Sequence, residues 1–140
     1  MGTERNLPEH LLLTGAPHNS SLSPFYVYPE IMGYDPQVAD RVWKLLVELE
    51  NVTERKMFGG VAFMMNGNMC CGVVDDRIVL RLGNDKAAKA LEEPNIEPMD
   101  FTGRPIRSMV YLESAGHRRD ADLKKWVRCA ASFTATLPPK

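Results

Sequence analysis

The spacing of hydrophobic residues predicts an amphipathic helix near the start of the ordered chain. Between Val38 and Leu49, apolar side chains recur three or four positions apart, which places them on one side of a helix. Asp35 is a good N-cap. Pro36 suits the first helical position, because the N–H group that proline lacks has no partner there. The helix should therefore begin at Pro36 and end near Asn51.

A second amphipathic pattern predicts a helix near the C-terminus. Asp120 or Asp122 should cap its first turn, and Pro138-Pro139 should stop it. Phe133 lies at the edge of its apolar stripe. The stripe itself consists of Leu123, Trp126, Val127, Ala130, Thr134 and Leu137.

Three apolar segments follow the first helix and predict strands. Asn66-Gly67, between the first two, is a strong signal for a type I′ turn, since both central residues of that turn need a positive φ angle. A second turn falls at Asp75-Asp76. The strands should run from Met57 to Met65, from Asn68 to Val74 and from Arg77 to Leu82.

A short helix and two further strands precede the C-terminal helix. Asn84 or Asp85 should cap the short helix, which Pro94 ends. The strands should span Pro98–Phe101 and Arg107–Glu113. The element order is α-βββ-α-ββ-α. Because strands joined by hairpins must be antiparallel, this order predicts an α+β domain with an antiparallel five-stranded sheet and helices packed on one face.

Composition separates an N-terminal segment from one compact domain. Residues 1–31 show neither a helical nor a strand period, so we expect a flexible extension, of the kind that a leader or tag supplies. The ordered domain should cover residues 32–140. No run reaches the roughly 18 apolar residues of a membrane span. Three cysteines are too few for a disulfide framework, as is typical of a reducing compartment. Together, these two observations predict a cytoplasmic protein without membrane association.

Residue patterns of phosphate, metal and catalytic sites are absent from the sequence. Gly59-Gly60 enters a strand and lacks a following Lys-Ser/Thr pair, so a bulge or a close backbone approach is the better interpretation. No histidine pair has metal-binding spacing, and no nucleophile elbow occurs. We therefore assign no catalytic residue, metal or cofactor, and we predict a protein that is not an enzyme.

Cys70 and Cys71 are adjacent on a predicted strand. Neighbouring strand residues point to opposite faces, so the two thiols should diverge and share no metal. Cys71 should be buried, with Cys70 on the other face. An alternative is a small-ligand-binding protein or a thiol-dependent enzyme that uses a sheet-face pocket near Cys70 and Arg81.

Positive charge is concentrated at the C-terminal end. Residues 101–140 carry 8 Lys/Arg against 3 Asp/Glu, whereas residues 1–100 carry 9 against 15. This end would suit an acidic protein surface or a phosphate backbone, although a solvated face on the final helix is the favoured interpretation. Without an aromatic platform or a helix-turn-helix pattern, specific DNA binding by the chain alone is not expected. The candidate partner-binding residues are Arg104, Arg118, Arg119, Lys124, Lys125 and Arg128.

Several short motifs carry a resemblance to a known family. They are Lys56-Met57-Phe58-Gly59-Gly60, Asn66-Gly67-Asn68-Met69, Leu80-Arg81-Leu82-Gly83, Pro98-Met99-Asp100-Phe101-Thr102-Gly103-Arg104-Pro105 and Leu137-Pro138-Pro139-Lys140. With these motifs, residues 32–140 resemble the N-terminal domain of the TfoX/Sxy family.

The resemblance implies a secretion-chaperone-like α+β fold and a regulatory role. Full-length members regulate natural competence by helping a cyclic-AMP receptor protein to activate promoters, and they carry a further helical domain that this sequence does not include. Among the motif positions, Phe58 should anchor a strand, and Arg81 should pair with Asp75, Asp76 or Asp100. We therefore predict an accessory transcription factor that acts through a protein partner. A homodimer formed through a sheet edge or through the uncovered face is an alternative.

Overall fold

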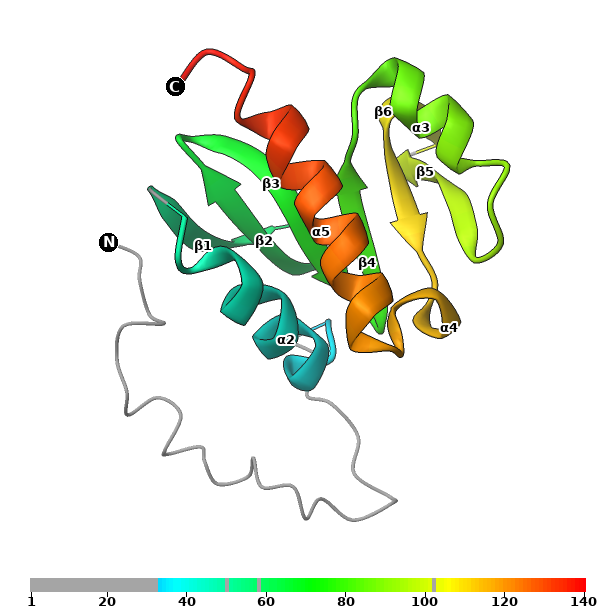
Figure 1. Cartoon of the computed structure of the whole chain (residues 1–140), viewed down its shortest axis with the longest axis horizontal. Coiled ribbons are helices and arrows are strands. Elements are labelled where there is room, and N and C mark those ends of the chain that lie inside the picture. The colour runs from blue at the N-terminus through cyan, green and yellow to red at the C-terminus, as the bar shows by residue number, and fades with distance from the viewer. Residues whose placement is uncertain (1–32, 50, 58, 102) are drawn as a thin grey trace.

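The computed structural model describes residues 33–49, 51–57, 59–101 and 103–140. Within them, helices cover one face of a single antiparallel sheet, as Figure 1 shows. The predicted α+β class is confirmed, but the sheet has six strands rather than five. The predicted extension, residues 1–31, lies outside the described residues. The elements are α2 (Pro36–Leu46), β1 (Val52–Met57), β2 (Gly60–Met65), β3 (Asn68–Val74), β4 (Arg77–Arg81), α3 (Asn84–Ala90), β5 (Ile96–Phe101), β6 (Arg104–Leu112), α4 (Ser114–His117) and α5 (Asp120–Thr134).

The additional strand is β1, most of which lies between the predicted end of the first helix near Asn51 and the predicted start of the first strand at Met57. Helix α2 ends at Leu46 rather than near Asn51, and Asn51 has a φ angle of 57° that helical residues do not adopt. The predicted strand from Met57 to Met65 is interrupted, because Gly59 has a φ angle of 75° and turns the chain between β1 and β2.

The strand order is β1-β2-β3-β4-β6-β5, so that β1 and β5 form the two edges. The exposed charged residues Arg55 and Lys56 lie on β1. Edge strand β5 contains Pro98, and its register with β6 shifts directly after that residue. The tight connection between β2 and β3 is the predicted type I′ turn, since Asn66 and Gly67 have φ angles of 53° and 84°.

The helix-covered face holds the main hydrophobic core. Phe63 on β2 is fully buried, and its ring centroid lies 6.0 Å from that of Trp43 on α2. Helix α5 crosses β3 and β4, while α3 packs on β6. In the described part of the chain, only strand residues contribute to the apolar cluster on the opposite face. Its buried members are Ala62, Met64, Met69, Val79, Met99 and Met109.

Of the N-cap residues predicted for α2, α3 and α5, the structure confirms only that of α2. Asp35 caps α2, because its carboxylate accepts a hydrogen bond of 2.8 Å from the backbone N–H of Gln37. Gly83 occupies the cap of α3 and Arg119 that of α5, and neither gives a side-chain cap bond. The predicted caps of these two helices are therefore wrong, since Asn84 and Asp120 are already the first helical residues.

The short helix α4 was not predicted, and it lies at a junction of three segments. The guanidinium of Arg41 on α2 donates to the carbonyl oxygen of His117 at 2.8 Å and to Oδ1 of Asp120 at 3.0 Å. The buried His117 ring places Nε2 2.9 Å from the carbonyl oxygen of Asp76, in the turn between β3 and β4. These bonds fix the start of α5 against the sheet.

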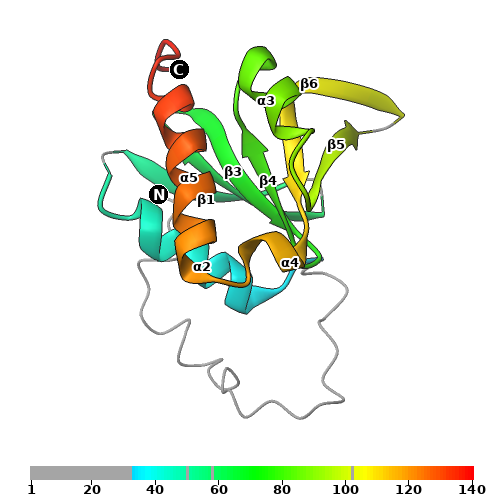
Figure 2. The ribbon, with the colours of Figure 1, turned by 45° about the vertical axis from the view of Figure 1, so that its right-hand side comes forward.

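The end of α5 is also fixed. The backbone N–H of Lys140 donates to the carbonyl oxygen of Asn66 at 2.9 Å, and the side-chain amide of Asn68 donates to the carbonyl oxygen of Pro138 at 3.0 Å. Because His117 before α5 bonds the β3–β4 turn and Lys140 after it bonds the β2–β3 turn, the segments on both sides of the helix hold it over the sheet. Figure 2 shows α5 and α3 side by side. The position of α5 therefore sets the width of the groove that lies between these two helices.

Candidate functional site

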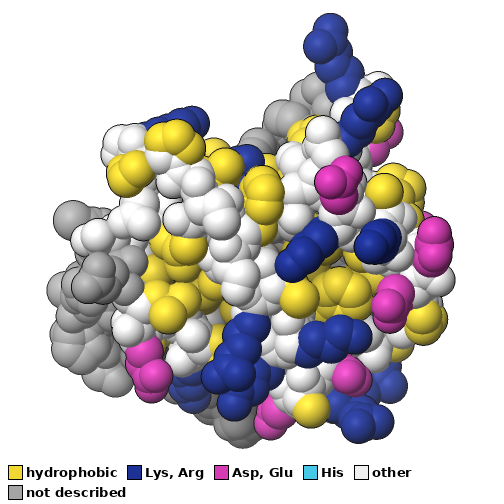
Figure 3. All heavy atoms as spheres, turned by 45° about the horizontal axis from the view of Figure 1, so that its top comes forward, with side chains coloured by type: hydrophobic (Ala, Val, Ile, Leu, Met, Phe, Trp, Pro, Cys, Tyr) yellow, Lys and Arg dark blue, Asp and Glu magenta, His cyan; other side chains and the backbone are white. Residues whose placement is uncertain are grey.

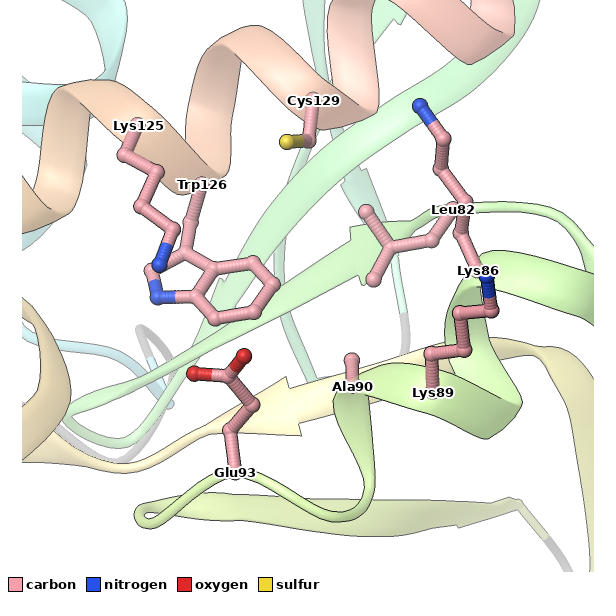
Figure 4. Close-up of a pocket in the computed structure, with 8 residues that line it drawn as sticks. All are labelled: Leu82, Lys86, Lys89, Ala90, Glu93, Lys125, Trp126 and Cys129. Carbon is pink, nitrogen blue, oxygen red and sulfur yellow. The ribbon is translucent and has the colours of Figure 1, made fainter.

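A groove of about 190 Å³ lies between α3 and α5. Its apolar part comes from Leu82, which follows β4, from Ala90 on α3 and from the indole ring of Trp126 on α5 (Figure 4). Leu82 and Ala90 are buried, whereas Trp126 is half-buried, and Figure 4 shows its ring extending from α5 into the groove. The full lining is Leu82, Lys86, Lys89, Ala90, Glu93, Lys125, Trp126 and Cys129.

Local sequence explains how the two helices form this groove. Ala87 and Ala90 are the buried residues of α3, so small side chains face the core and Lys86 and Lys89 beside them remain at the surface. Gly83 caps α3 at a φ angle of 87°, and a Cβ atom there would lie 2.6 Å from the ring of Phe133 on α5. Glycine at this position therefore permits the close approach of the Phe133 ring on α5 to the start of α3.

The rim of the groove is positively charged. The lining contains three lysine side chains, Lys86, Lys89 and Lys125, and only one carboxylate, that of Glu93. Figure 4 shows Lys86 and Lys89 on the α3 side and Lys125 on the α5 side. Nζ of Lys125 lies 4.7 Å from the centroid of the Trp126 ring, within the range of a cation–π interaction. Figure 3 shows basic side chains around an apolar surface on this side of the molecule. The groove can therefore accept an apolar group that is flanked by negative charge.

Only one of the basic residues predicted to bind a partner lines the groove, and that residue is Lys125. Lys124 and Arg128 are exposed on α5 but do not belong to the lining. Arg118 and Arg119 lie at the junction of α4 and α5, where Nε of Arg119 is 3.8 Å from a carboxylate oxygen of Asp122. Arg104 is exposed at the start of β6, a strand that packs under α3.

Sequence reasoning missed Lys86, Lys89 and Trp126 as members of a site. Trp126 was assigned to the inner stripe of α5, although it is only half-buried. Lys86 and Lys89 are three positions apart on α3 and so share one side of that helix, which was the available signal. What the sequence did not indicate is that this side of α3 faces α5.

The two adjacent cysteines do not diverge across the sheet. On β2, Phe63 pairs with Cys71 and Met64 pairs with Met69, so Cys70 is an extra residue in β3. Such a bulge breaks the alternation of side chains, and Cys70 joins Cys71 in the core beneath the helices. Their Sγ atoms are 3.7 Å apart, and the two residues are 1% and 0% exposed. The prediction of opposite faces was therefore wrong.

The surroundings of the two thiols shift their pKa values in opposite directions. A hydrogen bond with the Cys71 thiol lowers the pKa of Cys70, although burial opposes this effect. The hydroxyl of Thr134 and the positive charge of Arg81 lower it further. The same thiol–thiol hydrogen bond, together with burial, raises the pKa of Cys71 well above its ordinary value. Cys70 is therefore the thiol of the pair that ionises first.

Comparison with known protein families identifies the domain. A family model described as the TfoX N-terminal domain matches residues 44–134, which make up about two thirds of the chain. This chain belongs to the TfoX N-terminal domain family. The match begins within α2 and includes the cysteine bulge, α3 and α5 up to its last residue. No curated protein matches the chain.

In this TfoX N-terminal domain, glycines of the predicted motifs permit tight turns and a close approach of two backbone segments. Gly59 and Gly103 have φ angles of 75° and 78° at the turns that precede β2 and β6. A Cβ atom on Gly60 would collide with the carbonyl oxygen of Val73 on β3, so the close backbone approach predicted for the Gly59-Gly60 pair is confirmed. Phe58 lies outside the described residues.

The remaining motif positions are mostly at the surface. Lys56, Arg104 and Pro105 are exposed, whereas Met57 is half-buried and packs against the methionine-rich cluster on the helix-free face. Arg81 does not pair with Asp75, Asp76 or Asp100, so the predicted ion pair is wrong. Its Nε atom instead donates a hydrogen bond of 2.6 Å to the carbonyl oxygen of Met69.

The predicted sheet-face pocket near Cys70 and Arg81 does not coincide with the groove, because neither residue lines it. Among the residues that the structure describes, no three His, Cys, Asp or Glu side chains gather as metal ligands would. In that same part of the chain, no helix combines the length and the apolar character needed to cross a membrane.

Proposed function

We propose that this TfoX N-terminal domain is a non-enzymatic interaction module that binds an acidic segment of a partner protein in the α3–α5 groove. The observation that carries the proposal is the combination of an apolar floor with three lysine side chains at the rim. A partner segment with one apolar residue between Asp or Glu residues would fill the floor and pair its carboxylates with Lys86, Lys89 and Lys125.

The size of the groove favours a side chain over a free small molecule. Its volume of about 190 Å³ is below the roughly 300–1,000 Å³ of typical ligand pockets. A single aliphatic or aromatic side chain fits this space. Trp126 offers the kind of half-buried aromatic surface that often contributes most to protein–protein affinity.

Nucleic acid is a poorer match to the same surface. A phosphate backbone would satisfy the three ammonium groups, but it would also place charge against Leu82 and Trp126 at the floor. Together with the resemblance to competence regulators, this comparison favours an acidic surface of the bacterial transcription machinery as the partner. The protein would then act in the cytoplasm as an accessory transcription factor.

Peptide binding tests the proposal directly. A panel of peptides, each with one Leu, Phe or Trp between Asp and Glu residues, is titrated against the folded chain at two salt concentrations. We expect saturable binding that weakens with salt, and no binding of peptides in which Lys replaces Asp and Glu. The variant Lys86→Glu/Lys89→Glu/Lys125→Glu should lose about tenfold or more in affinity, since each partly exposed ion pair contributes about 0.2–1 kcal/mol and each reversal adds repulsion.

A matched variant separates the groove from general charge. Lys124→Glu/Arg128→Glu changes two cations on the same helix α5 that do not line the groove. This variant should retain most of the affinity for the peptides. Equal losses in both variants, or retention of binding in Trp126→Ala, would show that the peptides recognise overall charge and would refute the groove as the binding site.

A further inference from the structure

We propose that Cys70 and Cys71 form a chelating dithiol site for a trivalent thiophile of the arsenous acid or arylarsine class. The β-bulge places both Sγ atoms on one face of the sheet, 3.7 Å apart. This site is separate from the α3–α5 groove and does not depend on partner binding.

The distance between the sulfurs selects the geometry of the atom that can bridge them. With bonds of about 2.3 Å, as in zinc–thiolate pairs, a bridging atom would subtend an angle of about 107° between the two sulfurs. A linear two-coordinate ion with the same bond length would need sulfurs about 4.6 Å apart. The pair is therefore preformed for a pyramidal or tetrahedral centre rather than for a linear one.

The surrounding side chains decide between these two geometries. A tetrahedral zinc ion needs four ligands. In the described part of the chain, no third His, Cys, Asp or Glu joins the two thiols in a possible metal site. A pyramidal trivalent centre needs only two sulfurs, because its third bond carries a hydroxide or an organic group. The dithiol therefore fits trivalent arsenic better than zinc.

Chelation also fits the backbone better than oxidation of the pair does. A disulfide requires sulfurs about 2.05 Å apart and Cα atoms about 4.4–6.8 Å apart. Adjacent residues across a trans peptide have Cα atoms only about 3.8 Å apart. An intervening atom spans the observed 3.7 Å between the sulfurs without a change of the bulge.

The binding reaction is an exchange of oxygen for sulfur ligands without any change of oxidation state. With arsenous acid, two As–O bonds break and two As–S bonds form. The two thiol protons leave with the two hydroxides as two molecules of water. With an arylarsine oxide, the single oxygen leaves as one water with both thiol protons. Cys70 should attack first, since it is the thiol that ionises more readily.

Access to the pair requires a local opening. Thr134 is the last residue of α5, and its hydroxyl faces Cys70. The residues after it are exposed or half-buried, and the side chain of Asn68 bonds the carbonyl oxygen of Pro138. Opening of the final turn of α5, with release of the bonds that hold Pro138 and Lys140, would uncover the thiols while the rest of the sheet stays folded, because such local openings cost less free energy than global unfolding.

Mass spectrometry of the folded chain after incubation with phenylarsine oxide tests the site. We expect one arylarsine per chain, with both Cys70 and Cys71 protected from later alkylation and Cys129 still alkylated. The adduct should resist excess monothiol and should be removed by a dithiol. Cys70→Ala and Cys71→Ala should each abolish the stable adduct, whereas Cys129→Ala should retain it.

Three results would overturn the site. The first is an adduct that survives in Cys71→Ala, and the second is an adduct that disappears in Cys129→Ala. The third is a folded wild-type chain that stays unmodified in excess reagent although the urea-unfolded chain reacts. The alkylation pattern of the wild-type chain keeps the test decisive even if an alanine variant fails to fold.

Discussion

Nε of Arg81 donates a hydrogen bond of 2.6 Å to the carbonyl oxygen of Met69. Met69 directly precedes Cys70, the extra residue that interrupts the ladder between β2 and β3. A bulge leaves backbone groups without their regular sheet partners, and the arginine supplies one of these partners from the neighbouring strand β4. Arg81 is therefore a structural residue that stabilises the cysteine bulge.

Arg81→Met should lower the free energy of unfolding by about 1.5–3 kcal/mol, because a hydrogen bond from a charged donor is lost. Urea denaturation measures this change. Arg104→Met, at an exposed position of β6, is the matched control and should alter stability by no more than about 0.5 kcal/mol. Equal effects of the two substitutions would contradict the role of Arg81.

Gly67→Ala should destabilise the protein more than Gly103→Ala. Both glycines have positive φ angles, 84° and 78°, so each alanine adds backbone strain. A Cβ atom on residue 67 would also lie 2.7 Å from the carbonyl oxygen of Lys140, whereas residue 103 faces open space. Displacing Lys140 would lose its bond to Asn66, which adds about 0.5–1.5 kcal/mol. Urea denaturation of the two variants would show this difference, and equal losses would count against the contact.

His117→Ala should cost about 2 kcal/mol or more of stability. The imidazole is 2% exposed and bonds the carbonyl oxygen of Asp76, so the substitution would remove this hydrogen bond and leave a cavity. Arg118→Ala, at the adjacent exposed position, should be nearly neutral and serves as the control. Thermal unfolding compares the two. A neutral His117→Ala would show that α4 does not hold the turn between β3 and β4.

Cys71→Ala should move the ionisation of Cys70 to higher pH. The hydrogen bond with the Cys71 thiol is the largest influence that lowers the pKa of Cys70, and the substitution removes it while burial persists. The ultraviolet absorbance of the thiolate, followed against pH in a Cys129→Ala background, measures the midpoint. A midpoint that stays in place or falls would mean that Arg81 and Thr134 suffice to favour the thiolate.

The sequence predicted the central hairpin and the helix-covered sheet because their signals are local. Asn66-Gly67 requires a type I′ turn, and Asp35-Pro36 specifies the start of α2. Strand β1 was missed because its charged residues, including Arg55 and Lys56, do not follow an apolar period. Edge strands need little burial, so hydrophobic patterning identifies them poorly.

The bulge and the groove could not be predicted for a different reason. Alternation along a regular strand places Cys70 and Cys71 on opposite faces, and only the register of β3 with β2 reveals the extra residue. The groove joins Lys86 and Lys89 on α3 to Trp126 on α5, which approach each other only because both helices pack on the same sheet. Neither relationship leaves a mark within a short stretch of sequence.

The two outermost strands have a consequence for behaviour at high concentration. The charges of Arg55 and Lys56 along β1 and the missing N–H group of Pro98 on β5 both discourage further strands from joining the sheet. Neither edge strand therefore offers a site at which a strand of another molecule could pair and begin a fibril. The folded protein should stay dispersed when it is concentrated, which makes it well suited to the solution titrations on which its role will be decided.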